Sequence, residues 1–221
     1  MSFKLLNISS MYPEYLKYFY AKNSAYKNLL YKETIDFLIQ DSTEFVASYT
    51  RTFRKKGIEA NCVIVNDTNL KNKWRLENNI KSKNNIDIIF DQINKYQPDI
   101  LWIDNLSYVT KEWLIEVRRR IKSIKLILAY HCAPCNQTIL RKLEGVDFLI
   151  TCTPGIRQDF ENRGLRSYLV YHGFDSDLHS RLSNDCFPLQ KFVFSGSLFL
   201  GVDSQGGRLE LIERMLKEKV D

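Results

Sequence analysis

Two residues of this chain combine reactive chemistry with a position directly after a short apolar run. His131 follows the run at residues 125–129, and Asp104 follows the run at residues 100–103. An imidazole with a pKa near neutrality, or a carboxylate in a cleft, can act as a general base toward a hydroxyl. Each also has a structural interpretation: His131 as a core imidazole bonded to backbone, and Asp104 as an Asx turn or helix cap beside Asn105.

The segment His131-Cys132-Ala133-Pro134-Cys135 could suggest a zinc or redox site. A structural zinc site usually needs four ligands, and the sequence has no second Cys or His pair at a matching interval. We therefore expect no metal site. An odd number of cysteines and no secretory signal predict reduced thiols rather than a disulfide framework. The five cysteines are Cys62, Cys132, Cys135, Cys152 and Cys186.

The elements that position these residues are six apolar runs that alternate with helical patterns. This alternation predicts an α/β fold with a parallel sheet covered by helices on both faces. Ligands of such sheets bind at the C-terminal edges of the strands, near the point where the strand order reverses. The predicted strands are residues 4–8, 60–65, 100–103, 125–129, 146–150 and 167–170. The candidate site residues just beyond them are Ser9, Ser10, Asp104, Asn105, His131, Thr151, Thr153 and His172.

Two further segments carry both a binding and a structural interpretation. Thr151 and Thr153 precede Pro154 at a predicted helix start, where exposed N–H groups could hold an anion or Thr153 could simply cap the helix. The tyrosine-rich stretch at residues 12–31, with Tyr12 at its start, could stack on a sugar or lipid acceptor or form a surface for a protein partner. It could also simply pack over the sheet as an amphipathic insertion. Residues 32–56 predict one long helix or two in tandem.

Composition and charge limit the function classes. The chain has 221 residues and a net charge of +6, but its basic residues are spread over many segments. Runs such as residues 51–56 and 118–122 end predicted helices, where cations complement the helix dipole. Dinucleotide-binding, P-loop and α/β-hydrolase glycine motifs are absent from the sequence. We expect a cytoplasmic protein without a nucleic-acid partner, with peripheral contact to an anionic membrane as a further option.

Several segments, taken in order, resemble GT-B glycosyltransferases, and most closely the bacterial group of spore-maturation CgeB-like proteins. They are residues 5–13, the strand end at His131, residues 151–154, residues 171–175 and residues 194–198. The resemblance implies two Rossmann-like domains, with acceptor binding in the first and nucleotide-sugar binding in the second. Within the matched segments, His172 and Gly173 resemble the residues that close the first domain, and Gly196 resembles a glycine of the first donor-domain loop.

On this resemblance, residues 1–190 form the acceptor-side domain with a helical tyrosine-rich insertion at about residues 12–56. Residues 191–221 form the first strand and helix of an incomplete donor domain, where Gly196, Ser197 and Arg208 would meet the donor. We expect a metal-independent transferase that moves a sugar from a nucleotide-sugar co-substrate to a cell-surface glycan or similar acceptor. A further domain or a partner subunit would complete the donor site. The alternative is a non-catalytic Rossmann-like module that binds a glycan or a protein.

Overall fold

The computed structural model describes residues 3–181 and 207–218. The chain divides into two compact units, residues 1–175 and residues 176–221. The predicted boundary at residue 190 lies outside the described residues, so it stays a prediction.

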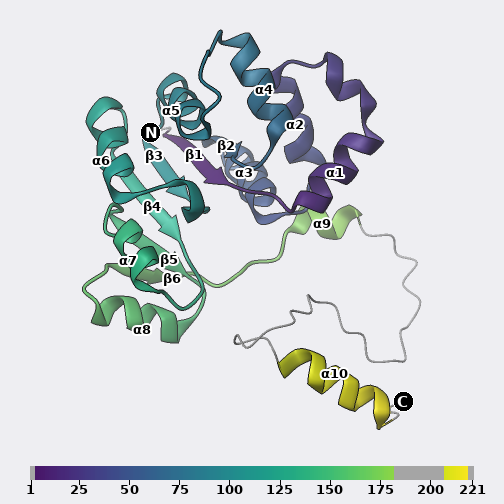
Figure 1. The fold of residues 1–221 in the computed structure, drawn as a ribbon, viewed down its shortest axis with the longest axis vertical. Coiled ribbons are helices and arrows are strands. Elements are labelled where there is room, and N and C mark those ends of the chain that lie inside the picture. Colours follow the sequence, from purple (N-terminus) through teal and green to yellow (C-terminus); the bar gives the residue numbers. More distant parts are fainter. Residues whose placement is uncertain (1–2, 182–206, 219–221) are drawn as a thin grey trace. The chain divides into compact units, whose positions relative to one another are not determined.

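The first unit is built on a parallel sheet, as the alternating apolar runs predict (Figure 1). The six strands of its described residues have the order β2-β1-β3-β4-β5-β6, and all five strand pairs are parallel. The order reverses between β1 and β3, which makes their C-terminal ends the expected place for a ligand. The strands are β1 (Lys4–Ser9), β2 (Glu59–Ile64), β3 (Ile100–Ile103), β4 (Leu126–Tyr130), β5 (Phe148–Thr151) and β6 (Ser167–Leu169).

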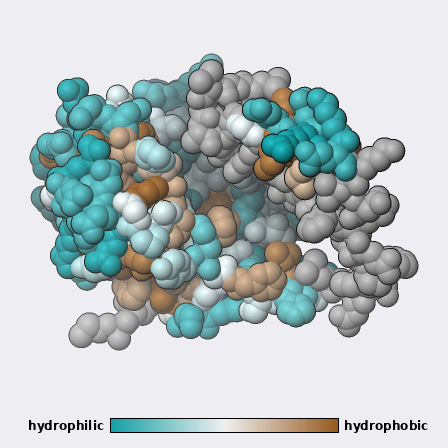
Figure 2. Space-filling view, turned by 90° about the horizontal axis from the view of Figure 1, so that it is seen from below, coloured by the Kyte–Doolittle hydropathy of each residue, from teal (hydrophilic) through white to brown (hydrophobic). Residues whose placement is uncertain are grey.

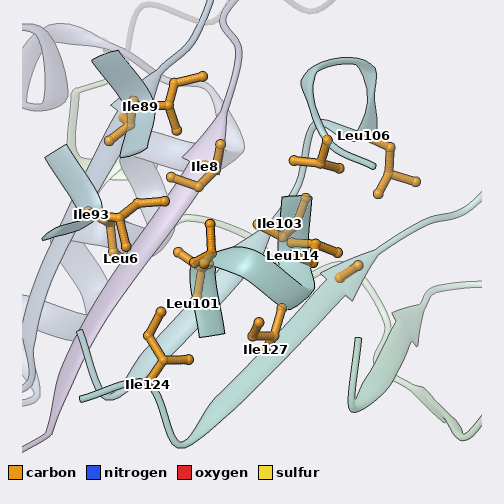
Figure 3. Packing of buried hydrophobic residues seen from close by; sticks show 14 of the residues in the cluster. Leu6, Ile8, Ile89, Ile93, Leu101, Ile103, Leu106, Leu114, Ile124 and Ile127 are labelled. Atoms are coloured by element: carbon orange, nitrogen blue, oxygen red, sulfur yellow. The ribbon is translucent and has the colours of Figure 1, made fainter. Parts of the chain in front are cut away.

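One face of the sheet is covered by helices α5 (Asn85–Tyr96), α6 (Lys111–Arg120), α7 (Gln137–Leu143) and α8 (Pro154–Asn162). Because side chains alternate between the two faces of a strand, Leu6 and Ile8 point to this face and Leu5 and Asn7 to the other. The isoleucine and leucine side chains of β1, β3, β4, α5 and α6 point toward one another in a continuous core (Figure 3). Burial of this apolar surface is the main stabilising term of the unit.

The opposite face is covered mainly by the helices between β1 and β2. Of the two alternatives predicted for residues 32–56, the structure has two helices in tandem, α2 (Tyr31–Asp41) and α3 (Phe45–Lys55). They follow α1 (Pro13–Lys22) and a 3-10 turn at Ser24–Asn28. Phe19 and Leu38 are fully buried there with Ile64 of β2, so much of the tyrosine-rich insertion is core. Helix α4 (Thr68–Glu77) begins at Asp67, whose carboxylate accepts a hydrogen bond from the Leu70 N–H at 3.0 Å.

The described part of the second unit consists of α9 (Ser176–Arg181) and α10 (Gly207–Lys217). The helix predicted within residues 191–221 is thus present as α10, whereas the strand predicted before it lies outside the described residues. Within the described residues, no helix has the length and apolarity needed to span a bilayer. Seen from below, hydrophobic side chains are interspersed with hydrophilic ones over the coloured surface (Figure 2).

Packing between α6 and the loop before β5 is tight enough to test. A Cβ added at Gly145 would lie 2.9 Å from Leu114 Cδ1 and 3.2 Å from Leu114 Cβ, and Leu114 is fully buried. We expect Gly145→Ala to lower the free energy of unfolding by about 1–3 kcal/mol, as overpacking does. Chemical denaturation measures the change.

The matched control is Gly155→Ala in the first turn of α8, where an added Cβ meets no atom within 4 Å. We expect this variant to be as stable as the original protein, or more stable by less than about 1 kcal/mol, because alanine favours a helix over glycine. Equal stabilities of the two variants would contradict the described packing.

Candidate functional site

The ends of β1 and β3 bring a serine and a carboxylate together. Ile8 pairs with Ile103 in the parallel register, so Ser9 and Asp104 follow on adjacent strands and on the same face. The Ser9 hydroxyl donates a hydrogen bond of 2.6 Å to Asp104 Oδ2. Among the described residues, no group donates a hydrogen bond to Asp104 Oδ1. Asp104 therefore has one oxygen fixed in place and one available to a ligand.

Burial dominates the electrostatics of Asp104. Desolvation raises the pKa of its carboxyl group above the ordinary value, and the hydrogen bond from Ser9 partly offsets this increase. A carboxylate made more basic in this way accepts a proton more readily than an exposed aspartate does. The Asx-turn role considered for Asp104 belongs to its neighbour, because Asn105 Oδ1 accepts from the Ser107 N–H at 2.8 Å.

The loop after β1 is fixed by side-chain amides. Asn105 Nδ2 donates to Ser10 Oγ at 2.9 Å. Asn66, just after β2, bonds Met11 twice: its Oδ1 accepts from the Met11 N–H at 3.1 Å and its Nδ2 donates to the Met11 carbonyl at 2.7 Å. Residues on both sides of the switch point thus hold the Ser9–Tyr12 loop in one conformation.

This loop forms one wall of a cleft of about 430 Å³. Glu44, at the start of α3, lies on the other side, and both of its carboxylate oxygens accept from the Tyr12 N–H, at 2.9 and 3.1 Å. Burial raises the pKa of Glu44, while this backbone hydrogen bond lowers it. Among the residues that the structure describes, no lysine or arginine lines the cleft. The lining residues are Ser9, Ser10, Tyr12, Tyr15, Thr43, Glu44, Phe45, Val46 and Asp104.

A second hollow of about 520 Å³ adjoins the first, because the two share Ser10, Tyr12 and Glu44 in their linings. It extends toward Asn66 and Tyr108, which follow β2 and β3. Residues at or just after the C-terminal ends of three strands therefore line these two adjoining hollows.

Aromatic rings extend from the cleft toward β4. The half-exposed Phe45 stacks on His172 at a centroid distance of 4.9 Å and on Tyr49 at 6.1 Å. The Tyr130 hydroxyl lies 3.1 Å from His172 Nε2, and Tyr49 packs on Trp102 beneath. Burial raises the pKa of Tyr49 and of Tyr130, and the charge of Asp104 adds to both increases. These rings are therefore electrostatic neighbours of Asp104.

A buried ion pair holds the segment after β6 against α3. Arg51 and Asp175 have side chains only 6% and 14% exposed, and Arg51 Nη2 lies 2.7 Å from Asp175 Oδ2. Ser48 donates to the same oxygen at 2.5 Å. This contact places His172 beside Phe45. The sequence predicts that residues 51–56 complement the helix dipole. In the structure, the main role of Arg51 is instead its long-range contact with Asp175.

His131 lies on the other face of the sheet. Its strand neighbour Ala129 belongs to the core formed with α5–α8, and the His131 ring packs on Phe160 of α8 at 6.3 Å. Burial lowers the pKa of His131, although a backbone hydrogen bond at Ala133 raises it, and its Nε2 atom has no hydrogen-bond partner among the described residues. The structure thus does not bring His131 to the cleft of Asp104, and a catalytic role for His131 stays a prediction.

The expectation that all five cysteines are reduced thiols is wrong. Cys132 and Cys152 form a disulfide that joins the ends of β4 and β5. Sequence spacing did not reveal it, since the two residues are 20 positions apart and meet only because their strands are adjacent. Cys62 and Cys135 are free thiols.

Thr151 and Thr153 lie beside this disulfide. Thr151 is fully buried, and no described residue bonds its hydroxyl. Thr153 is the N-cap residue of α8, but its side chain does not cap the helix. Its Oγ1 atom lies 3.2 Å from Cys132 Sγ instead.

The other predicted site residues are more dispersed. Gly173 is exposed next to His172, and an added Cβ there would meet no atom within 4 Å. Gly196 and Ser197 lie outside the described residues. Arg208 belongs to α10, and its side chain lies outside what the structure describes. Their roles toward a donor stay predictions.

Three residues of the site were missed by the sequence interpretation, namely Glu44, Phe45 and Tyr130. Glu44 and Phe45 are the N-cap and the first residue of α3 and do not follow a strand, so the strand-end rule does not select them. The predicted strand ends at residue 129, whereas in the structure Tyr130 is the last residue of β4. The weak sequence signal for Glu44 is its position just before the second of two helical patterns.

No protein-family model matches the chain, and no curated protein or solved structure matches it significantly. The sheet topology and helix layers are compatible with a Rossmann-like α/β fold.

The electrostatics of Asp104 predict an effect on stability. A carboxyl group whose folded-state pKa is raised stabilises the fold below its unfolded pKa and loses this contribution as pH rises through the folded value. We therefore expect Asp104→Asn, which can still accept from Ser9, to melt at a higher temperature than the original protein at pH 7. The difference should vanish below the ordinary aspartate value of 3.8.

Asp99→Asn is the control of opposite sign. Hydrogen bonds from Lys125 and from the Lys4 backbone lower the pKa of Asp99, so its stabilising contribution is present at neutral pH and is lost in acid. This variant should melt at a lower temperature at pH 7. We measure melting temperatures between pH 3 and 8. If both variants shift the melting temperature in the same direction, the opposite pKa shifts assigned to Asp104 and Asp99 are contradicted.

Proposed function

We propose that residues 3–175 act as the acceptor-binding domain of a metal-independent glycosyltransferase of the GT-B type. The observation that carries the proposal is the partly buried Asp104 carboxylate, fixed by Ser9 through one oxygen and open at the other, at the reversal point of a parallel sheet. Support also comes from the motif resemblance, since its first segment, residues 5–13, contains most of β1 and the whole Ser9–Tyr12 loop.

The lining of the cleft fits a sugar hydroxyl better than a phosphate. Asp104 and Glu44 are hydrogen-bond acceptors for hydroxyl groups, and the exposed rings of Tyr12 and Phe45 offer apolar faces for the C–H surface of a sugar. A pyrophosphate would face two carboxylates, and the described part of the lining contains no cation. The cleft therefore suits the acceptor, while the nucleotide-sugar donor would bind elsewhere.

The proposed reaction uses Asp104 as general base. Its Oδ1 accepts the proton of an acceptor hydroxyl while that oxygen attacks the anomeric carbon of the donor. The bond from the anomeric carbon to the diphosphate breaks, and the nucleoside diphosphate leaves with the electron pair. Ser9 keeps the carboxylate oriented, and the raised pKa of Asp104 makes it a better proton acceptor. This assignment describes an inverting transfer.

The test uses nucleoside diphosphate release from UDP- and GDP-sugars in the presence of a glycan mixture. If release is found, Asp104→Asn should lower kcat by about 10²–10⁴-fold, the usual contribution of a general base, with little change in the acceptor KM. The His131→Ala variant is the matched control, since His131 lies on the opposite face and should leave kcat close to that of the original protein.

Binding measurements separate the enzyme from the alternative of a glycan-binding module. A ligand that binds the native state raises its melting temperature. Glycans that raise the melting temperature of both the original protein and Asp104→Asn, without nucleoside diphosphate release, would favour the binding module. If neither glycans nor nucleotide sugars change the melting temperature, the proposal is wrong for this chain.

A further inference from the structure

The structure brings together positive charge that is separated in the sequence. Residues 15–31 contain three lysines and no acidic residue, and residues 68–84 contain four lysines, one arginine and a single glutamate. Eight cations against one acid give these two segments a net charge of +7, whereas the whole chain carries +6. Helices α1, α2 and α4, to which most of these residues belong, lie together and away from α6 and α7 (Figure 1).

Lys73 of α4 joins the two segments. Its Nζ atom donates a hydrogen bond to the Leu29 carbonyl and lies 5.8 Å from the centre of the Tyr26 ring. The Tyr31 N–H donates to Glu77 Oε1 at 2.6 Å, four residues further along α4. The turn before α2 is therefore fixed against α4, which brings the two basic segments into contact.

Most of this charge is not neutralised within the protein. Lys17, which lies 3.8 Å from Glu14, is the only cation of the two segments that forms an ion pair with a described residue. Lys73 and Arg75 donate to main-chain carbonyl groups, which leaves their charge uncompensated. Cations elsewhere, such as Lys111, pair with carboxylates. An external anion is the complement of such a region.

The two glutamates that border this region are engaged at the start of α2. Glu33 Oε2 accepts from the Leu30 N–H at 2.8 Å, and Glu77 binds the next N–H, that of Tyr31. The N-terminal end of a helix carries partial positive charge, which balances part of the charge of both carboxylates.

Exposed apolar side chains lie next to these cations. Leu30 is 59% exposed and Leu76 is 77% exposed. Leu76 comes three residues after Lys73 and so lies on the same face of α4, and Leu30 directly follows the residue whose carbonyl binds Lys73. Tyr18 of α1 is 58% exposed, and Lys22 Nζ lies 5.6 Å from the centre of its ring. We define the basic–apolar surface as Lys22, Lys27, Leu30, Lys73 and Leu76.

This combination fits a bilayer with anionic lipids better than a nucleic acid. An anionic membrane attracts lysines to its lipid phosphates, while leucine side chains enter the boundary between headgroups and acyl chains. The backbone of a nucleic acid offers phosphate charge but no apolar phase for exposed leucines. The long lysine side chains also keep their charge at the level of the headgroups when the leucines lie deeper.

We propose that the basic–apolar surface binds peripherally to a bilayer that contains anionic lipids. Its lysines lie at the lipid phosphates, and Leu30 and Leu76 enter the apolar boundary. The surface shares no residue with the lining of the Asp104 cleft. The proposal is independent of the proposed transferase function.

The test is co-sedimentation of the full chain with large vesicles. One set consists of phosphatidylcholine alone, and the other contains about one-third phosphatidylglycerol, which gives a negative surface potential. We expect binding to the anionic vesicles to be at least about tenfold stronger than binding to the neutral ones. Raising the salt concentration from about 0.05 M to about 0.5 M should weaken this binding, because the Debye length shortens.

The charge variant is Lys22→Gln/Lys27→Gln, which removes two exposed cations. It should bind anionic vesicles at least about tenfold more weakly, the effect of two lysines close to such a surface. The matched control is Lys122→Gln/Arg141→Gln, which removes two exposed cations beside α6 and in α7. This control should bind within about twofold of the original protein, since charges far from the membrane are screened.

The apolar variant is Leu30→Gln/Leu76→Gln, which keeps the charge of the surface. It should bind at least about fivefold more weakly, because membrane affinity scales with the apolar area buried. The matched control is Ile115→Gln/Val170→Gln, at positions 55% and 50% exposed outside the surface, and it should bind as the original protein does. If the leucine variant also binds as the original protein does, the surface recognises anionic charge alone, as for a nucleic acid, and the proposal is overturned.

A measurement on the original protein decides the question if a variant fails to fold. In bicelles of anionic lipid that contain a spin-labelled lipid, the methyl NMR signals of Leu30 and Leu76 should broaden, whereas those of Ile115 and Val170 should stay sharp. Equal broadening of all four signals overturns the proposal. Equal binding of the original protein to anionic and neutral vesicles, or binding to neither, also overturns it.

Discussion

The pairing of β1 with β3 is the contact on which the candidate site depends. The Ile8 carbonyl accepts from the N–H groups of both Asp104 and Asn105, at 2.9 and 3.1 Å, and so extends the strand register one step past β3. This extension places Asp104 next to Ser9 on one face and Asn105 next to Ser10. The reversal of strand order at this pair leaves the two loops free to diverge and to border a cleft.

The cleft also depends on contacts that reach it from distant parts of the first unit. Glu44 accepts from the backbone of Tyr12, and α3 begins at the next residue. Arg51 lies on the same helix. Its guanidinium donates to the Ser42 carbonyl at 2.6 Å and pairs with Asp175 at 2.7 Å. A buried guanidinium with several partners is costly to disrupt, because removing one partner leaves a charge without compensation. Helix α3 therefore links the aromatic rings of Phe45 and His172 to the Glu44 carboxylate.

The sequence alone predicts the strands well, because buried parallel strands are continuous apolar runs with few alternatives. Residues 100–103 match β3 without a difference, and the other strands are shifted at their ends or, as in β5, shortened. The strand-end rule selects Ser9 and Asp104, which the structure brings into hydrogen-bond contact. It cannot tell which face a side chain occupies, and therefore it groups His131 with Asp104, although a single step in the strand alternation places His131 on the α8 side.

Contacts between residues far apart in the chain were beyond prediction. The disulfide between Cys132 and Cys152 requires knowledge that β4 and β5 are neighbours, and the Arg51–Asp175 pair joins residues 124 positions apart. The tyrosines show the same limit. Composition does not reveal that Tyr15, Tyr20 and Tyr31 turn their hydroxyls to Asp41, Asp67 and Gln92, while Tyr12 stays exposed at the cleft.

The central claim is that Asp104 is a partly buried carboxylate kept basic by desolvation and oriented by Ser9. The most direct measurement is a ¹³C NMR titration of the Asp104 carboxyl group in the original protein and in Ser9→Ala. The account predicts a pKa above the ordinary 3.8 in the original protein and a still higher value in Ser9→Ala, because the Ser9 hydrogen bond lowers it. A pKa at or below 3.8 in the original protein would contradict the account.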